Sequence, residues 1–431
     1  LGFAYMPTDK RFVANYKNGA WDEGTLTSDP NVVLNECACV FQYSQSCFEG
    51  LKAYTTEDGH IVTFRPDLNA SRMADSARRL EMPPFPEDRF VQAIVDTVKA
   101  NIDYVPPYGS GATLYIRPYM FGSNPVIGVK PADEYQFRIL TTPVGPYFKG
   151  GAKPITIKVS DFDRAAPHGT GHIKAGLNYA MSLYPTMEAH RAGFAENIYL
   201  DPSTHTYVEE TGGANVLFVD KDNNLIVPKS NSILPSVTRR SLVYVGEHYL
   251  GLKVIERQVK FSEVKDMKEC ALCGTAAVLA PVGMIHSEDG DIYFPSGMDK
   301  IGEISGKIRE TLLKIQSCEI EAPEGWIKDG QTYTVNVPAQ DTVTFTLKNS
   351  AKPGLRIIKY DRQTHETLPD ITFKIYKDND LIGTFETDRL GEILLTDLEP
   401  GTYRVEEVAS DDEHVVDIMP QEIELKAGDG I

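Results

Sequence analysis

Hydrophobic positions follow two different patterns along this 431-residue chain. Up to about residue 326, short apolar runs of strand length are interspersed with longer segments in which apolar side chains recur every three or four residues. The second spacing places apolar side chains on one face of a helix, whereas a short apolar run is typical of a buried strand. The first part of the chain therefore predicts an α/β (α+β) fold of mixed helices and strands.

The same patterns place individual elements in this first part. Helices are predicted over residues 69–80, with Asn69 as a candidate N-cap, and over residues 90–102, 178–192, 236–249 and 302–315. Strands are predicted over residues 114–117, 137–142, 155–159, 197–200, 207–209 and 216–219, and a hairpin is predicted over residues 51–64. The turn-rich residues 145–151 predict a connector between two domains, residues 1–147 and 148–326.

From residue 331 onward, apolar and polar residues alternate with period two. This alternation is typical of half-buried strands, and turn residues separate the runs at short intervals. The strand-like runs are residues 333–338, 342–347, 355–360, 371–376, 381–386, 392–395, 403–408 and 423–425. We predict a partial all-β sandwich in two pieces, terminal strands over residues 327–352 and an incomplete sandwich over residues 353–431.

Charge excludes some classes of partner. The formal net charge is −18, from 43 Lys and Arg against 61 Asp and Glu, and it argues against nucleic acid and anionic membrane as partners. No run approaches the roughly 20 apolar residues that a transmembrane helix needs. The chain opens at Leu1 without an initiator Met, so we interpret it as a fragment.

Cysteine usage indicates the redox setting. The six cysteines all lie in the first part of the chain: Cys37, Cys39, Cys47, Cys270, Cys273 and Cys318. So few in so long a segment do not predict a disulfide scaffold, and they favour a reduced, cytoplasmic location. Cys270 and Cys273 have the spacing of half a zinc site, but no second pair and no nearby His accompany them. We therefore predict no metal site and two buried free thiols.

Lys174 is the first candidate for chemistry. Most lysines are solvated surface residues, but Lys174 lies between Gly169-Thr-Gly171 and Ala175-Gly176, where small side chains leave room for a planar partner. A partly desolvated amine has a lowered pKa and can attack an aldehyde. Spacing alone leaves the surface interpretation open.

Eight stretches together resemble a known family. They are residues 47–54 (CFEGLKAY), 64–73 (FRPDLNASRM), 114–118 (LYIRP), 144–148 (VGPYF), 172–179 (HIKAGLNY), 210–215 (ETGGAN), 234–240 (LPSVTRR) and 274–276 (GTA). Each is weak alone, but in this order and spacing the segment from Leu1 to about Trp326 resembles the branched-chain aminotransferases. That resemblance implies the two-domain α/β architecture of fold-type IV pyridoxal-phosphate enzymes.

The resemblance implies pyridoxal 5'-phosphate as cofactor and gives roles to matching residues. Lys174 matches the catalytic lysine that bonds to the cofactor, Glu210 the carboxylate that keeps the pyridine nitrogen protonated, and Tyr179 the residue that binds the phenolic oxygen. Without the resemblance, Glu210 would be a surface acid at a strand end, which is our interpretation of Glu209. Tyr179 would be ordinary helix packing.

Phosphate and substrate contacts are implied in the same way. Arg72 and Thr275 match phosphate-binding positions, and Val237 and Thr238 begin a predicted helix, where free N–H groups favour an anion. The expected substrate residues are Phe3, Tyr43, Tyr115, Arg117, Tyr147 and Ala276. Aromatic residues are more often core than pocket, so these assignments depend on the resemblance.

The implied reaction is ping-pong transamination of L-leucine, L-isoleucine and L-valine with 2-oxoglutarate, which gives 2-oxo acids and L-glutamate. Members of this family are homodimers or larger homo-oligomers. Two fold-type IV alternatives stay open, a D-amino-acid aminotransferase and an aminodeoxychorismate lyase. L-Leucine and D-alanine, compared as amino donors, discriminate between a branched-chain and a D-amino-acid enzyme.

The tail resembles a second family. Residues 352–361, 368–373 and 398–407 are similar to the Cna-B repeats of Gram-positive adhesins and pilins. Lys359 matches the lysine that forms an intramolecular isopeptide bond in such repeats, and Glu407 the acid that promotes it; ordinary strand charge is the alternative. The expected acceptor Asn would follow Ile431, and Asn349 matches the acceptor of a preceding repeat.

The two resemblances meet inside residues 319–326, which fit the end of either family. We hypothesise that this junction is a chimera of sequence assembly, which sequencing of one uninterrupted DNA molecule across codons 300–350 would test. The alternative of another class is a surface adhesin with an enzyme-like head, which cell fractionation would test.

Overall fold

The computed structural model describes residues 4–146 and 152–320, and in the tail residues 326–327, 350–351, 353–359, 361, 367–378, 380–388, 391–396, 398–409 and 420–426. Contacts divide the chain into two compact units, Leu1–Ile320 and Glu321–Ile431. Each unit is described by itself. The domain limits expected within them stay predictions.

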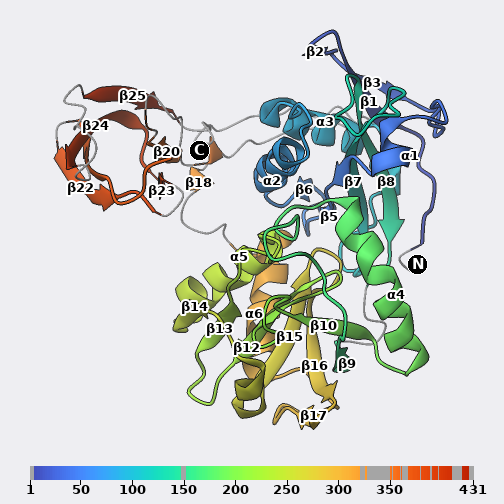
Figure 1. Cartoon of the computed structure of the whole chain (residues 1–431), viewed down its shortest axis with the longest axis vertical. Helices are drawn as coiled ribbons and strands as arrows, with labels where there is room; N and C mark the ends of the chain where they lie inside the picture. Colours follow the sequence, from blue (N-terminus) through green and yellow to red (C-terminus); the bar gives the residue numbers. More distant parts are fainter. Residues whose placement is uncertain are drawn as a thin grey trace. The chain divides into compact units, whose positions relative to one another are not determined.

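Within residues 4–146 the strands form one eight-stranded antiparallel sheet (Figure 1). The order is β2-β1-β8-β7-β5-β6, with β3 beside β1 and β4 beside β7. The strands are β1 Arg11–Lys17, β2 Ala20–Trp21, β3 Thr25–Thr27, β4 Ser46–Phe48, β5 Leu51–Thr55, β6 Ile61–Thr63, β7 Thr113–Gly122 and β8 Tyr135–Val144. The hairpin predicted over residues 51–64 is β5 and β6.

Helices cover this first sheet. They are α1 Cys39–Tyr43, α2 Pro66–Arg79, α3 Glu87–Lys99 and the short 3-10 helix η1 Ile102–Tyr104. α2 and α3 pack against each other, and the apolar face of α3 buries Phe90 and Ile94 in a core shared with Phe137 of β8. The helix prediction is confirmed, but Asn69 is not its cap. α2 begins at Pro66, because proline suits the first helical position.

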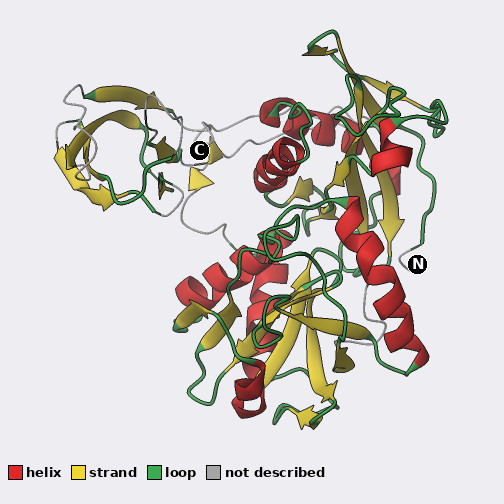
Figure 2. Ribbon diagram, in the orientation of Figure 1, coloured by secondary structure: helices red, strands yellow, loops and turns green. Residues whose placement is uncertain are grey.

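Within residues 152–320 a second sheet closes on itself (Figure 2). Pairing runs β11-β10-β9-β16-β15-β12 and returns from β12 to β11, while β13 and β14 extend from β12 and β17 pairs with β16. The strands are β9 Ile155–Val159, β10 Glu196–Leu200, β11 Val208–Thr211, β12 Asn215–Val219, β13 Leu225–Pro228, β14 Val254–Arg257, β15 Glu269–Gly274, β16 Val278–Ser287 and β17 Gly290–Tyr293. The helical elements are α4 Gly176–Arg191, α5 Val237–Tyr244, η2 Val245–Tyr249, η3 Phe261–Asp266 and α6 Glu303–Gln316.

The two cysteines at half-zinc spacing lie in different cores. Cys270 and Cys273 are three residues apart on β15, so their side chains point to opposite faces of the strand. Cys270 packs with Phe218, whereas Cys273 packs with Leu279 and Leu312. Both are buried free thiols, as expected, and burial raises the pKa of Cys273 to about 12. Among the described residues no group of three His, Cys, Asp or Glu side chains could hold a metal.

The second unit is β-rich in its described residues. The strands are β18 Trp326–Ile327, β19 Ser350–Ala351, β20 Leu355–Ile358, β21 Thr372–Lys377, β22 Asp380–Glu386, β23 Glu392–Leu395, β24 Gly401–Ala409 and β25 Gln421–Leu425. They pair as β22-β21-β24-β25, β20-β23 and β18-β19. Ile371, Ile375 and Tyr403 centre its apolar core. The strands predicted over residues 333–338 and 342–347 lie outside the described residues.

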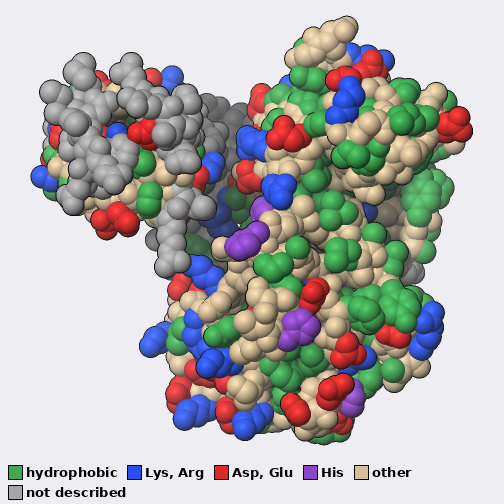
Figure 3. Space-filling view, viewed as in Figure 1, with side chains coloured by type: hydrophobic (Ala, Val, Ile, Leu, Met, Phe, Trp, Pro, Cys, Tyr) green, Lys and Arg blue, Asp and Glu red, His purple; other side chains and the backbone are tan. Residues whose placement is uncertain are grey.

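Both signs of charge occur together on one face of the first unit. On the face shown in Figure 3, the Lys and Arg side chains of the first unit are interspersed with Asp and Glu. A helix long and apolar enough to span a membrane does not occur in the parts of the chain that the structure describes.

Candidate active site

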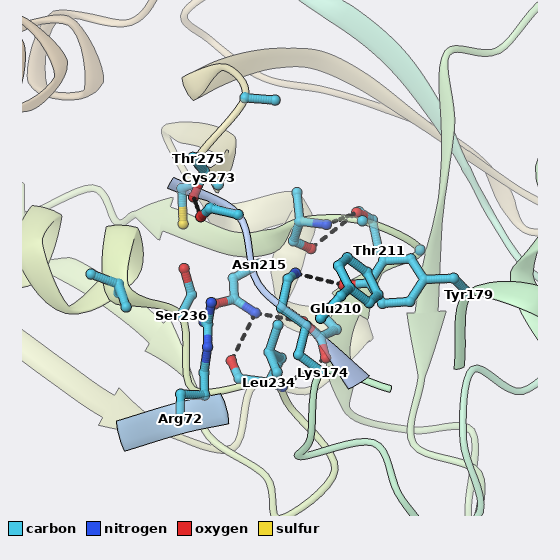
Figure 4. A pocket seen from close by; sticks show the side chains of 18 of the residues that line it. Arg72, Lys174, Tyr179, Glu210, Thr211, Asn215, Leu234, Ser236, Cys273 and Thr275 are labelled. Atoms are coloured by element: carbon cyan, nitrogen blue, oxygen red, sulfur yellow. Dashed lines mark hydrogen bonds between the residues drawn. The ribbon is translucent and has the colours of Figure 1, made fainter. Parts of the chain in front are cut away.

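Both sheets of the first unit contribute to one cavity of about 200 Å³ (Figure 4). From the first sheet and its helix come Phe48, Gly50, Arg72, Tyr115 and Arg117. From the second part come Arg164, Ile173, Lys174, Tyr179, Glu210, Thr211, Gly212, Gly213, Ala214, Asn215, Leu234, Ser236, Val237, Cys273, Gly274, Thr275 and Ala276. Seven of the eight sequence stretches singled out above, all but residues 144–148, therefore contribute described residues to this cavity.

Lys174 is held from both sides of this cavity. Its backbone N–H donates to the Ser76 hydroxyl of α2 at 3.0 Å, and its carbonyl accepts from the Phe48 N–H of β4 at 3.1 Å. The Lys174 ammonium donates to the Tyr179 hydroxyl at 2.8 Å and lies 4.9 Å from the centre of the Phe48 ring. The amine is thus positioned by a fixed backbone, an aromatic ring and a phenol.

Glu210 lies where the second sheet closes. It pairs in register with Asn215, where β11 meets β12. Its carboxylate accepts from the Leu234 N–H at 2.8 Å and from the Asn215 side chain, and it forms an ion pair with Arg164 at 2.7 Å. Burial raises the pKa of Glu210 to about 7, although Arg164 and the other donors oppose this. Glu210 can therefore hold a proton near neutral pH, or share one with a bound base.

Glu209 was expected at the surface, and this expectation is wrong. Both faces of β11 are covered, so Glu209 is also buried, on the opposite side of the strand from Glu210. Its carboxylate accepts from the Ser230 hydroxyl at 2.7 Å. The alternation of side chains along a strand correctly places the two acids on opposite faces of β11. It does not predict that both of these faces are covered by other parts of the protein.

Arg72 is oriented by a buried carboxylate. The Glu49 carboxylate is fully buried and accepts hydrogen bonds from Nε and Nη2 of Arg72, each at 2.7 Å, in a bidentate ion pair. Asn69 donates to the same carboxylate at 2.7 Å, which explains its burial inside α2. The third nitrogen of Arg72 donates to the Pro235 carbonyl at 3.0 Å, beside the start of α5.

The start of α5 also faces the cavity. The Ser236 hydroxyl caps the helix by accepting from the Arg239 N–H at 3.1 Å, and Ser236 and Val237 line the cavity. Thr238 is buried behind them and is not among the lining residues that the structure describes. Thr275 lines the cavity, and its hydroxyl donates to the Gly50 carbonyl at 3.1 Å.

Two of the expected substrate residues are neighbours on β7. Arg117 donates to the Tyr115 hydroxyl at 2.8 Å and lies 4.7 Å from the centre of the Phe48 ring. Gly50 makes room for this pair, because a Cβ there would lie 2.3 Å from the Tyr115 hydroxyl oxygen. Ala276 also lines the cavity.

The remaining expected substrate residues are not placed at the cavity. Tyr43 is not among its described lining residues; its hydroxyl donates to the Ile127 carbonyl instead. Phe3 and Tyr147 lie outside the described residues. Their roles stay predictions.

Arg164, Phe48, Glu49 and Ser76 were not singled out from the sequence. Phe48 and Glu49 fall inside residues 47–54, one of the stretches that carry the family resemblance, so their position could have marked them as site residues. Arg164 had no such signal, since its partners Glu210 and Ser232 are distant in sequence. Gly171 makes room for Arg164, because a Cβ at this position would lie 2.8 Å from Arg164 Nη2.

Comparison with known proteins agrees with this geometry. A family model described as amino-transferase class IV matches residues 46–285. The branched-chain-amino-acid aminotransferase of Haemophilus influenzae is 48% identical over 332 residues, which cover 76% of this chain and 96% of that protein. The chain belongs to the branched-chain aminotransferases of class IV. The Helicobacter pylori aminotransferase of the same name is 46% identical over 332 residues.

Solved structures confirm the architecture of this aminotransferase. The Escherichia coli branched-chain amino acid aminotransferase matches with a TM-score of 0.61 at 26% identity, over 73% of this chain and 96% of that one. A second family model, described as a prealbumin-like fold domain, matches residues 353–431. The predicted fold-type IV architecture is therefore confirmed, and the β-sandwich expected over residues 353–431 matches a prealbumin-like domain.

The prealbumin-like unit brings the two expected isopeptide residues together. The Lys359 ammonium lies 2.7 Å from a Glu407 carboxylate oxygen, and the Glu407 side chain is only 3% exposed. The other Glu407 oxygen is buried without a hydrogen-bond partner among the described residues. Asn349, which was expected to be the acceptor of a preceding repeat and not the partner of Lys359, lies outside the described residues.

Proposed function

We propose that the first unit binds pyridoxal 5'-phosphate and transfers the amino group of L-leucine, L-isoleucine and L-valine to 2-oxoglutarate. The observation that carries the proposal is the meeting of Lys174, Tyr179, Glu210 and Arg72 in one cavity. The similar proteins of Haemophilus influenzae and Helicobacter pylori, both named for branched-chain amino acids, support the choice of substrate.

The chemistry of the side chains fits this cofactor. A primary amine can bond to its aldehyde, a buried carboxylate can bind its ring nitrogen, and Arg72 with the start of α5 can receive its phosphate. Gly212, Gly213 and Ala214 line the same cavity with little bulk, which leaves space for a flat ring. When bound, the cofactor would supply an electron sink for the carbanion at the substrate α-carbon.

The residues of the chain would move protons and orient the substrate. Lys174 Nζ would take the α-proton as general base and return it as general acid, while the Tyr179 hydroxyl fixes the position of the amine. Glu210 would keep a proton on the ring nitrogen, because its carboxylate accepts from donors on three sides. Tyr115 and Arg117 would orient the substrate, and the Phe48 ring would exclude water.

The test uses the full chain with added pyridoxal phosphate and records the near-visible absorbance before and after L-leucine. The unaltered protein should show a band that bleaches with leucine, and Lys174→Ala should lack it or be inert. Lys307→Ala, at an exposed position on α6, is the matched control and should behave like the unaltered protein. No band, or a band indifferent to leucine and to Lys174, would overturn the proposal.

A response to D-alanine in place of L-leucine would instead favour the D-amino-acid alternative. The oligomeric state, a homodimer or larger, stays a prediction that sedimentation would test.

A further inference from the structure

The backbone on either side of the Lys174 amine is held by three hydrogen bonds. The Asn178 side chain donates to the Ile173 carbonyl at 2.9 Å, and the Phe48 N–H of β4 donates to the Lys174 carbonyl at 3.1 Å. Between them, the Lys174 N–H donates to the Ser76 hydroxyl at 3.0 Å. Ser76 differs from the other two partners, because it brings a side chain from α2, 98 residues away in the sequence.

The Ser76 hydroxyl serves two segments at once. Its O–H donates to the Arg72 carbonyl, one turn earlier on α2, at 2.9 Å, while its oxygen accepts from the Lys174 N–H. A hydroxyl has one proton to donate and two lone pairs to accept, so the two bonds do not compete. Ser76 is fully buried and is not among the described residues that line the cavity, so it acts through the residues that it contacts.

These contacts close a ring. Phe48 donates to the Lys174 carbonyl, and the next residue on the chain is Glu49. The Glu49 carboxylate holds the Arg72 guanidinium through two bonds of 2.7 Å. The Arg72 carbonyl accepts from Ser76, and Ser76 accepts from the Lys174 N–H, which returns to the start. Arg72 and Lys174, which both line the cavity, are therefore tied to each other on two sides, through β4 and through α2.

The ring fixes a spacing that the proposed cofactor requires. Pyridoxal phosphate is short and stiff, and Arg72 must meet its phosphate while Lys174 meets its aldehyde. The two ends of a stiff ligand are bound well together only where the two protein groups already lie at the matching distance. On the α2 side the ring depends on one hydroxyl. Without it the Lys174 N–H loses its acceptor, and Lys174 can shift relative to Arg72.

We propose that Ser76 is a positioning residue that sets the distance between the Lys174 amine and the Arg72 guanidinium, so that the aldehyde and the phosphate of the cofactor are met together. This role rests on the proposed function. Ser76 acts through two backbone groups and not by contact with the reacting atoms.

The test compares Ser76→Ala and Ser76→Cys with the unaltered full chain, by equilibrium dialysis against two forms of the cofactor. Pyridoxal 5'-phosphate presents both a phosphate and an aldehyde, whereas pyridoxamine 5'-phosphate has the same ring and phosphate but cannot bond to Lys174. Ser76→Ala should raise the dissociation constant for pyridoxal phosphate about tenfold and leave that for pyridoxamine phosphate within about twofold. Ser76→Cys has a weaker acceptor and should lie between Ser76→Ala and the unaltered protein.

A second readout is the kinetics with saturating cofactor. Ser76→Ala should lower kcat for L-leucine about tenfold with KM within about twofold, because a displaced amine impairs proton transfer and not substrate binding. Thr97→Val is the matched control. Thr97 is also fully buried, and its hydroxyl donates to the Ala93 carbonyl four residues earlier on α3, outside the ring. It should match the unaltered protein in both dissociation constants and in kcat.

Equal losses for the two forms of the cofactor would show general damage to the site and overturn the role of Ser76. An unchanged dissociation constant for pyridoxal phosphate would overturn it as well. If Ser76→Ala does not fold, Ser76→Cys carries the same comparison with smaller changes. Failure of the unaltered protein to show a leucine-sensitive band would instead overturn the proposed function, and this role with it.

Discussion

Glu210 shows how far the surroundings of one residue decide its chemistry. Its carboxylate is buried beside Arg164, and the balance leaves its pKa raised to about 7 from a usual 4.5. Burial favours the protonated acid, whereas Arg164 and the two amide donors favour the carboxylate. A basic group of a bound ligand that takes up the Glu210 proton would leave the carboxylate ionised and so favour its ion pair with Arg164.

The raised pKa predicts a pH dependence of stability in protein without cofactor. The folded state holds the Glu210 proton more tightly than the unfolded state, so this stabilisation is fully present below pH 4.5 and is lost as the pH rises to about 7. At 1.36 kcal/mol per pKa unit the loss is at most about 3 kcal/mol. Glu210→Gln cannot ionise and should lack this component.

Urea unfolding of the unaltered protein and of Glu210→Gln, at several pH values between 5 and 8, measures this pH-dependent stabilisation. The difference in free energy of unfolding between the two proteins isolates Glu210, because all other groups are shared. A difference that does not change with pH would contradict the expected proton uptake.

For single residues, the sequence predicts those whose partners lie in the same short motif. It misses residues whose partners lie in distant segments of the chain. Lys174 and Tyr179 are five residues apart and meet across the start of one helix, so a local stretch was enough. Arg164 and Ser76 act only because distant segments fold against them. No local pattern distinguishes such a residue from surface Arg or Ser.

Among the elements, the spacing of apolar residues predicts that a helix exists more reliably than it predicts how the helix begins and ends. The helix predicted over residues 302–315 is α6, Glu303–Gln316, but its capping group comes from elsewhere. Gly302 at the N-cap has no side chain, and the buried Glu269 of β15 accepts from the Ile304 and Ser305 N–H groups at 3.1 and 2.8 Å. A cap supplied by a neighbouring strand leaves no mark near the helix in the sequence.

Because the Glu269 carboxylate caps α6, we expect its removal to lower the free energy of unfolding more than the removal of an exposed carboxylate does. Glu269→Ala removes the acceptor for two N–H groups at the positive end of α6 and should cost about 1–2 kcal/mol. The matched control is Glu303→Ala, which removes an exposed acid of the same helix and its ion pair with Lys307, and should cost under about 0.5 kcal/mol. Urea midpoints at unchanged slope measure both. Equal costs would show that the contact does not cap the helix.

For the whole molecule, the central question is whether the two units depend on each other. Each has its own apolar core, and the two family models match separate segments, residues 46–285 and 353–431. The sequence predicted this division because the apolar period changes along the chain. The chimeric origin of the junction stays a hypothesis, which DNA sequencing across codons 300–350 tests.

The separate cores predict that the aminotransferase unit works without the tail. The described residues that line the cavity all fall within Leu1–Ile320, as do the clusters that surround Phe137, Phe218 and Leu312. A chain cut after Ile320 should therefore bind pyridoxal phosphate and respond to L-leucine with a kcat/KM within about twofold of the full chain. Ile320 itself packs against the core around Leu312, so a second cut after Cys318 removes this contact and should lower the urea midpoint. If the first cut abolished the leucine-sensitive band while circular dichroism showed an intact fold, the tail would be part of the active enzyme, and an accidental junction would no longer explain its presence.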